Sequence, residues 1–263
     1  MSETLRNEIL FYLLKDGKMP LRKIAKLTGK NHATIAYHYN KLIEDGILGD
    51  FYLYVNPNLF GFYHFFAAYN NDIARPYPNF VASSFTCVEG FTVLEVMGKS
   101  KEEVVDRISS LGDPIMIFDV NNVIHNLSDS VSKMIKLLAE NPKVEFSQVS
   151  SKVGLPVRWV YKKYNHLEKI GMIKIIPKVN LSKANVLLFS VFSKEPIESL
   201  DNWLVLRMVG KKSSLYLGVA RNMGEAYIIA SSLRSIVKDV TFTLKIDYDV
   251  TRWLNNGANQ STT

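Results

Sequence analysis

The chain has 263 residues, 47% of them hydrophobic, and a formal net charge of +7 at pH 7. Its length and hydrophobic content exclude a disordered tail protein and allow two ordinary domains or about four small ones. A single cysteine, Cys87, excludes an intrachain disulfide and a cysteine zinc cluster.

The N-terminal segment MSETLRNEIL carries charges and has no apolar signal core. The longest apolar runs, such as residues 186–192, fall well short of the roughly 20 residues that cross a bilayer. We therefore expect a cytoplasmic protein.

Two helices are predicted at the start of the chain. Thr4 is a candidate N-cap for the first, and Asp16-Gly17 ends it. The second covers residues 21–27, with Ile24 and Leu27 facing inward.

A third helix follows after a tight turn at Gly29, where glycine can take a positive φ without steric cost. Asn31 is its predicted N-cap and Gly46 its stop. Its inward stripe consists of Ile35, Tyr39 and Leu42. Residues 47–55 are then predicted to form a wing hairpin.

An internal repeat is the strongest pattern in the sequence. Residues 21–48 (LRKIAKLTGKNHATIAYHYNKLIEDGIL) align without a gap on residues 146–173 (FSQVSSKVGLPVRWVYKKYNHLEKIGMI). The aligned pairs include Gly29 with Gly154, Ile35 with Val160, Tyr39 with Tyr164, Asn40 with Asn165, Leu42 with Leu167 and Gly46 with Gly171. The repeat predicts a second three-helix unit, with helices that open at Ser128, Phe146 and Pro156.

The segments between and after the repeats predict small α+β domains. In the second one we expect a strand at 186–192, a helix at 197–203, a hairpin of 204–209 and 215–219 turned at Lys211-Lys212, a helix at 224–236 and a strand at 240–248. That order, β-α-β-β-α-β, is the ferredoxin-like unit. The first one matches less well: strands at 60–69, 91–97 and 115–120, a helix at 101–111, and a segment interrupted by Pro76 and Pro78.

The helix-turn-helix repeat and the segment YVNPNLFGFYHFF that follows its first copy resemble the Lrp/AsnC (feast/famine) family of transcription regulators. The resemblance implies a winged helix-turn-helix joined to a ferredoxin-like (RAM-type) domain, here in tandem duplicate. The fold class is then α+β, with two winged helix-turn-helix domains alternating with two ferredoxin-like domains. The implied boundaries are 1–56, 57–126, 127–180 and 181–254, followed by a mobile tail at 255–263.

The outward face of each third helix is the candidate DNA-binding surface, because a major groove is wide enough to admit a helix. The first face presents Asn31, His32, Thr34, Tyr37, His38 and Lys41, and the second presents Arg158, Trp159, Lys162, Lys163 and His166. Residues 128–180 hold ten Lys and Arg against four Asp and Glu, so we expect the second copy to supply more of the salt-dependent affinity. Two copies in one chain would imitate a dimer, with helices about 34 Å apart.

Other chemistries have little support in the sequence. The five histidines do not form a metal-binding pair, and the motifs of serine hydrolases, P-loop enzymes and dinucleotide-binding enzymes do not occur, so we expect no cofactor and no metal. The turn at Val96–Ser100 has amides that could hold a small anion, a weak indication of an effector site.

Two alternatives remain open. Proteins of similar architecture decarboxylate a haem precursor of the siroheme type, and the candidate cavity residues for that activity are His64 and His125. Residues 51–127 are net acidic, which disfavours a substrate with many carboxylates. The other alternative is that one winged helix is a protein-docking surface, for which Arg158 and Trp159 are suited.

Overall fold

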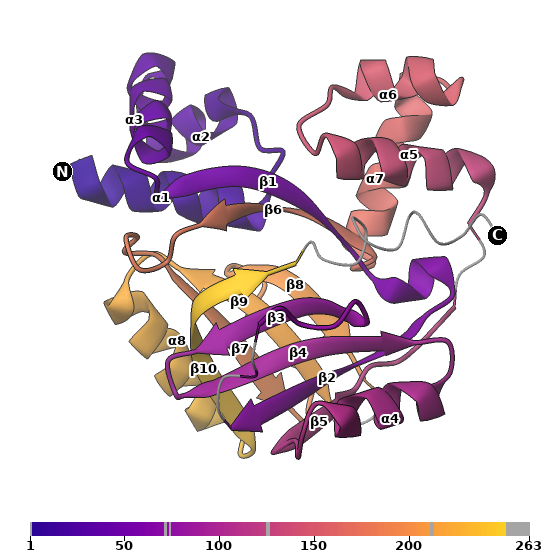
Figure 1. Cartoon of the computed structure of the whole chain (residues 1–263). Coiled ribbons are helices and arrows are strands. Elements are labelled where there is room, and N and C mark those ends of the chain that lie inside the picture. Colours follow the sequence, from indigo (N-terminus) through magenta and orange to yellow (C-terminus); the bar gives the residue numbers. More distant parts are fainter. Residues whose placement is uncertain (1, 71–72, 74, 125–126, 211–212, 251–263) are drawn as a thin grey trace. The chain divides into compact units, whose positions relative to one another are not determined.

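The computed structural model describes residues 2–70, 73, 75–124, 127–210 and 213–250. The chain forms two compact units, one from residues 1–51, 87–89 and 176–247, the other from residues 52–86, 90–175 and 248–263. Each unit contains a three-helix head and a four-stranded antiparallel sheet (Figure 1). The expected α+β class is confirmed. The Lys211-Lys212 turn, His125 and the tail lie outside the described residues.

The head of the first unit consists of α1 (Ser2–Lys15), α2 (Leu21–Thr28) and α3 (His32–Glu44). Leu13, Ile24 and Leu42 are fully buried in its core. Because α1 begins at Ser2, Thr4 lies inside the helix and is not its N-cap, contrary to our prediction. Leu27 is also not inward as predicted, since 49% of it is exposed.

The turn between α2 and α3 has the predicted conformation. Gly29 has a φ of +65°, in the left-handed region that favours glycine. Gly154 occupies the same place before α7 with a φ of +78°. Both heads thus use the same turn to set the third helix across the second.

Strand β1 (Leu48–Val55) follows α3, and β6 (Ile173–Val179) follows α7. The predicted wing hairpin does not form, because β1 pairs with β6 in a two-stranded sheet (Figure 1). The N–H of Asn180 donates to the carbonyl of Ile47, and that of Asn56 to the carbonyl of Met172. The two strands therefore run antiparallel, and each satisfies the backbone groups that a hairpin partner would have paired.

The sheet of the first unit has the strand order β10-β7-β9-β8, formed by β7 (Leu187–Ser193), β8 (Leu204–Val209), β9 (Ser214–Ala220) and β10 (Val240–Asp249). Helix α8 (Met223–Ile236) buries Ala226, Ile229 and Leu233 against one face of it. This is the ferredoxin-like order without its first helix. The predicted helix at 197–203 does not form, and residues 199–203 are turns.

The sheet of the second unit has the equivalent order, β5-β2-β4-β3. Its elements are the 3-10 helix η1 (Pro57–Phe60), β2 (Tyr63–Asn70), β3 (Val81–Cys87), β4 (Phe91–Gly98), α4 (Lys101–Ser110) and β5 (Met116–Asp119). The sequence reading missed β3, whose polar Ser83 and Ser84 interrupt the apolar pattern although both are buried.

The head of the second unit consists of α5 (Asp129–Glu140), α6 (Phe146–Val153) and α7 (Val157–Lys169), each of which begins within one residue of its predicted start. Val160, Tyr164 and Leu167 form the predicted inward stripe of α7, and all three are buried. Within the residues that the structure describes, no helix combines the length and apolar character that crossing a membrane requires.

Candidate nucleic-acid interface

Helix α3 is held so that its first turn faces outward. The Asn31 side chain accepts a hydrogen bond from the N–H of Thr34 at 2.7 Å, which confirms the predicted N-cap. Ile35 and Leu42 are fully buried on the opposite side. Tyr39, predicted on the same inward stripe, is half-buried, and burial raises the pKa of its phenol.

The structure separates the predicted residues of α3 into two groups. Asn31, His32 and Tyr37 are exposed, whereas Thr34, His38 and Lys41 are half-buried. The ammonium of Lys41 lies 2.7 Å from the carboxylate of Glu44, which raises the pKa of this lysine. His32 and Tyr37 are therefore best placed to reach a base edge, and the charge of Lys41 is partly neutralised within its own helix.

Helix α7 presents a more basic face. Arg158, Lys162 and His166 are exposed at a spacing of four residues, so they lie on one side of the helix. Trp159 and Lys163 are half-buried beside them. In the part of the chain that the structure describes, no carboxylate pairs with Arg158, Lys162 or Lys163. Their charges are therefore available to a polyanion.

Helix α2 and the turn after it carry a further group of cations that our site prediction omitted. Arg22, Lys23, Lys26 and Lys30 are exposed, and no carboxylate pairs with them among the described residues. In helix-turn-helix proteins the helix before the recognition helix crosses the DNA backbone. The signal in the sequence was the Lys23–Lys26 spacing on the polar side of an amphipathic helix, and it adds phosphate-binding charge to the first head.

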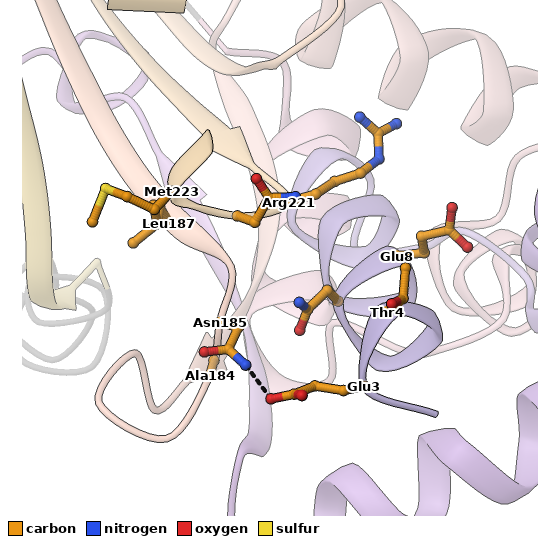
Figure 2. Close-up of a pocket in the computed structure, with 10 residues that line it drawn as sticks. Glu3, Thr4, Glu8, Ala184, Asn185, Leu187, Arg221 and Met223 are labelled. Carbon is orange, nitrogen blue, oxygen red and sulfur yellow. Dashed lines mark hydrogen bonds between the residues drawn. The ribbon is translucent and has the colours of Figure 1, made fainter. Parts of the chain in front are cut away.

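A cavity of about 400 Å³ lies within the first unit, between α1 and the start of α8 (Figure 2). Its polar lining includes Glu3, Glu8, Asn185 and Arg221, and Asn185 donates a hydrogen bond to Glu3. The guanidinium of Arg221 lies 3.8 Å from the ring centroid of Phe11 in α1. The walls thus join the head to the ferredoxin-like sheet of the same unit.

In the turn at Val96–Ser100, the amide of Lys99 is already bonded within the protein. The N–H of Lys99 donates to the carboxylate of Glu103 at 2.5 Å, and the hydroxyl of Ser100 accepts from the N–H of Glu103. An internal carboxylate therefore occupies the position that we had considered for an anion.

His64 lies in a buried polar cluster of the second unit. Its Nδ1 is 2.7 Å from Oε1 of Glu95, which also accepts a hydrogen bond from the hydroxyl of Tyr54 at 3.0 Å. The other oxygen of Glu95 accepts from Ser83 at 2.6 Å. Nε2 of His64 has no hydrogen-bond partner among the described residues. The described residues contain no group of three or more His, Cys, Asp or Glu that could hold a metal ion.

Comparison with known proteins bears on the first head. Residues 3–48 match a family model described as winged helix-turn-helix DNA-binding. The chain is 42% identical over 55 residues to the HTH-type transcriptional regulator FL11 of Pyrococcus furiosus, and 44% identical over 54 residues to FL11 of Pyrococcus abyssi. These matches cover 21% and 20% of this chain, and the chain spans 36% of the length of each relative.

Among solved structures, the siroheme decarboxylase NirDL aligns over 96% of this chain and 97% of its own, with 12% identity and a TM-score of 0.42. An AsnC family transcriptional regulator from Agrobacterium tumefaciens aligns over 45% of this chain and 89% of its own, with 18% identity and a TM-score of 0.25. Both alignments are too loose to bear on function. The sequence match identifies the N-terminal head as a winged helix-turn-helix, and the geometry of α1–α3 agrees with the helical part of that description.

Proposed function

We propose that this protein is a cytoplasmic, sequence-specific DNA-binding transcription regulator of the Lrp/AsnC type. The observation that carries the proposal is the pair of third helices, each fixed by a buried apolar stripe with its polar face turned to solvent. The family match at residues 3–48 supports DNA binding by the first of them.

We further propose that the chain is an internal duplication with domains at 1–56, 57–126, 127–180 and 181–254, so that one chain acts as a pseudo-dimer. The equivalent strand orders of the two sheets support this, as do the matching ends of α3 and α7. Gly46 and Gly171 both have a positive φ, each two residues after the end of its helix.

In this proposal the two helices contribute differently. Arg158, Lys162 and Lys163 of α7 neutralise phosphates, so they supply affinity that falls with salt. His32 and Tyr37 of α3 contact base edges, while the cations of α2 contact the neighbouring phosphates of the DNA backbone. The contact of α3 with DNA is supported by Asn31, Thr34, His38 and Lys41. The contact of α7 with DNA is supported by Trp159 and His166. Two unlike faces imply an asymmetric operator.

Charge reversal on α7 tests this proposal. We expect the double variant Lys162→Glu/Lys163→Glu to weaken binding of a labelled promoter fragment by roughly 10- to 100-fold and to reduce the salt slope by about 2, because two phosphate contacts are lost. Fluorescence anisotropy measured against salt concentration gives both values.

The matched control is Lys133→Glu/Lys136→Glu, which makes the same change of charge on exposed positions of α5 in the same head. If both double variants weaken binding equally, the effect is one of net charge, and α7 is not the contact surface. An unchanged affinity in the α7 variant would favour a protein-docking role for this head.

The cavity between α1 and α8 is our candidate effector site. Its volume of about 400 Å³ lies in the range of small-molecule pockets. A ligand there would contact both the head and the sheet of the first unit. It could therefore change the orientation of α3 relative to that sheet. Asn185→Trp fills the cavity, and we expect it to abolish any response of DNA affinity to a panel of small metabolites.

One observation keeps the haem-precursor decarboxylase as a second candidate. The unpartnered Nε2 of buried His64 is a group that a bound substrate could satisfy. Against it, the imidazole is fully buried and its sheet belongs to the net acidic segment 51–127. Adding an iron tetrapyrrole to the protein distinguishes the regulator from the decarboxylase. If the absorption spectrum of the tetrapyrrole does not change, it does not bind and the decarboxylase is excluded.

A further inference from the structure

The lining of the cavity between α1 and the start of α8 indicates the class of ligand that it would bind. Helix α1 contributes Glu3, Thr4, Asn7 and Glu8, and the rest of the wall comes from residues within 184–187 and 221–223 (Figure 2). All of these residues belong to the first unit. The charges that are not yet paired within the protein decide what a ligand must supply.

The cavity retains a negative charge. Its one arginine is already paired, because Nη1 of Arg221 lies 2.6 Å from Oε1 of Glu225. Glu3 accepts a hydrogen bond from the side-chain amide of Asn185. Glu8 is half-buried, and no other described residue forms a hydrogen bond or an ion pair with its carboxylate. Two carboxylates thus remain without a cation in a chain whose net charge is +7.

The carboxylate of Glu8 is not needed for the packing of a head. The alignment of residues 21–48 on 146–173 continues without a gap toward the N-terminus and superposes α1 on α5. It pairs three buried residues of one helix with three of the other: Ile9 with Met134, Leu10 with Ile135 and Leu13 with Leu138. In this alignment Glu8 corresponds to the exposed Lys133. The acidic lining is therefore a property of the first unit alone and not of the fold.

The opposite wall of the cavity is apolar. Figure 2 shows Leu187 and Met223 across from Thr4 and Glu8. Met223 is 60% exposed, so its flexible side chain is available to cover methylene groups of a ligand. Glu3 and Glu8 are separated by about 7.5 Å along the axis of α1, given the rise per residue of a helix. A short aliphatic chain with an ammonium group at each end is complementary to both walls.

The electrostatics of the cavity select a cation. An anion would be repelled by two carboxylates, and a neutral ligand would leave both of them uncompensated. An ammonium group forms charge-assisted hydrogen bonds with a carboxylate, which are stronger than hydrogen bonds between neutral groups. We propose that the cavity binds a short aliphatic diamine, with its ammonium groups at Glu3 and Glu8 and its methylene chain on Leu187 and Met223. The role of such a diamine as an effector rests on the proposed function, whereas its binding does not.

Isothermal titration calorimetry of the full chain without DNA tests this binding. Putrescine is the probe, and butanediol and succinate are its neutral and anionic counterparts of equal carbon number. We expect putrescine to bind at a single site and both counterparts to bind at least about tenfold more weakly, because neither donates charge-assisted hydrogen bonds. Absence of putrescine binding overturns the proposal, and so does equal binding of butanediol.

Two variants of Glu8 locate the site. We expect Glu8→Gln to weaken putrescine binding by about tenfold, since a charge-assisted hydrogen bond becomes a neutral one. Glu8→Lys should abolish binding, and it should fold because lysine occupies the corresponding position of α5. Glu198→Gln is the matched control, because it removes the same charge from an exposed position of the first unit outside the cavity. Binding that Glu8→Lys leaves intact, or that Glu198→Gln weakens as much as Glu8→Gln does, overturns the proposal.

DNA affinity is measured separately, because a diamine also binds to the phosphates of DNA. If the protein binds DNA but not putrescine, the ligand is wrong and the proposed function stands. If it binds putrescine but not DNA, the ligand stands and the regulator is wrong. If it binds both, we expect putrescine to change the DNA affinity of the wild-type protein but not that of Glu8→Lys. Equal changes in the two proteins exclude putrescine as an effector.

Discussion

At the residue scale, the fully buried Glu95 of β4 connects side chains that are distant in sequence. Its two carboxylate oxygens accept hydrogen bonds from the hydroxyls of Tyr54 in β1 and Ser83 in β3. Such a cluster is assembled only by the tertiary fold, whereas the Asn31 cap and the Gly29 turn depend only on neighbouring backbone groups.

The Tyr54–Glu95 contact leads to a prediction about alkaline pH. Burial, and then the charge of Glu95, raises the pKa of Tyr54 well above its ordinary value of 10.0. The unfolded chain releases this proton first, so the stabilisation from Tyr54 is complete below pH 10 and is lost as the pH rises above it.

We expect Tyr54→Phe to lower the free energy of unfolding by about 1–2 kcal/mol at neutral pH, because one buried hydrogen bond is lost. Above pH 10 the variant should lose stability less steeply than the wild-type protein. Urea unfolding at pH 8 and at about pH 11 measures both effects. Tyr37→Phe, at an exposed position, should change neither the free energy of unfolding nor its dependence on pH. If the free energy of unfolding falls equally with pH in the wild-type protein and in Tyr54→Phe, the role of Tyr54 is contradicted.

At the element scale, the predicted helices other than that at 197–203 form within a few residues of their expected ends, and the remaining errors concern strands and their pairing. The amphipathic periods of α5, α6 and α7 are set by local spacing, so their ranges could be predicted from the sequence. Residues 47–55 were predicted as a wing hairpin, but they form the single strand β1, whose partner β6 is distant in sequence. Strand β3 escaped detection because its buried hydroxyl groups mimic the composition of a loop.

Close packing inside the first unit makes one glycine critical. Gly218 of β9 lies opposite Phe189 of β7, and a Cβ at this position would overlap the phenyl ring. Phe189 cannot move aside easily, because it is fully buried and stacks on Phe242 with ring centroids 4.9 Å apart.

We therefore expect Gly218→Ala to destabilise the protein by about 2–3 kcal/mol through overpacking. Phe189→Leu, added to it, should recover part of that loss in a thermal or urea unfolding experiment. Gly90→Ala offers a comparison without steric overlap, because Gly90 has a φ of +84° and open space around its Cα. Its cost should stay near 1 kcal/mol. A fully tolerated Gly218→Ala would contradict the packing described for this sheet.

At the scale of the whole molecule, the sequence predicted the two three-helix heads but not how the strands that follow them pair. The repeat of residues 21–48 at 146–173 predicted two heads, and both form. The chain passes between the two units within β1 and again within β6, so neither unit is a continuous segment. The candidate site was partly predictable: both helix faces were identified, but the cations of α2 and the ion pair of Lys41 were not.

Hydroxyl-radical footprinting determines whether α3 and α7 both contact DNA. The DNA fragment would be one selected by the protein from random sequence. We expect two separate protected segments with the wild-type protein, of which Lys162→Glu/Lys163→Glu loses one and keeps the other. Absence of protection, or a single protected segment that this variant leaves unchanged, would contradict DNA contact by both helices.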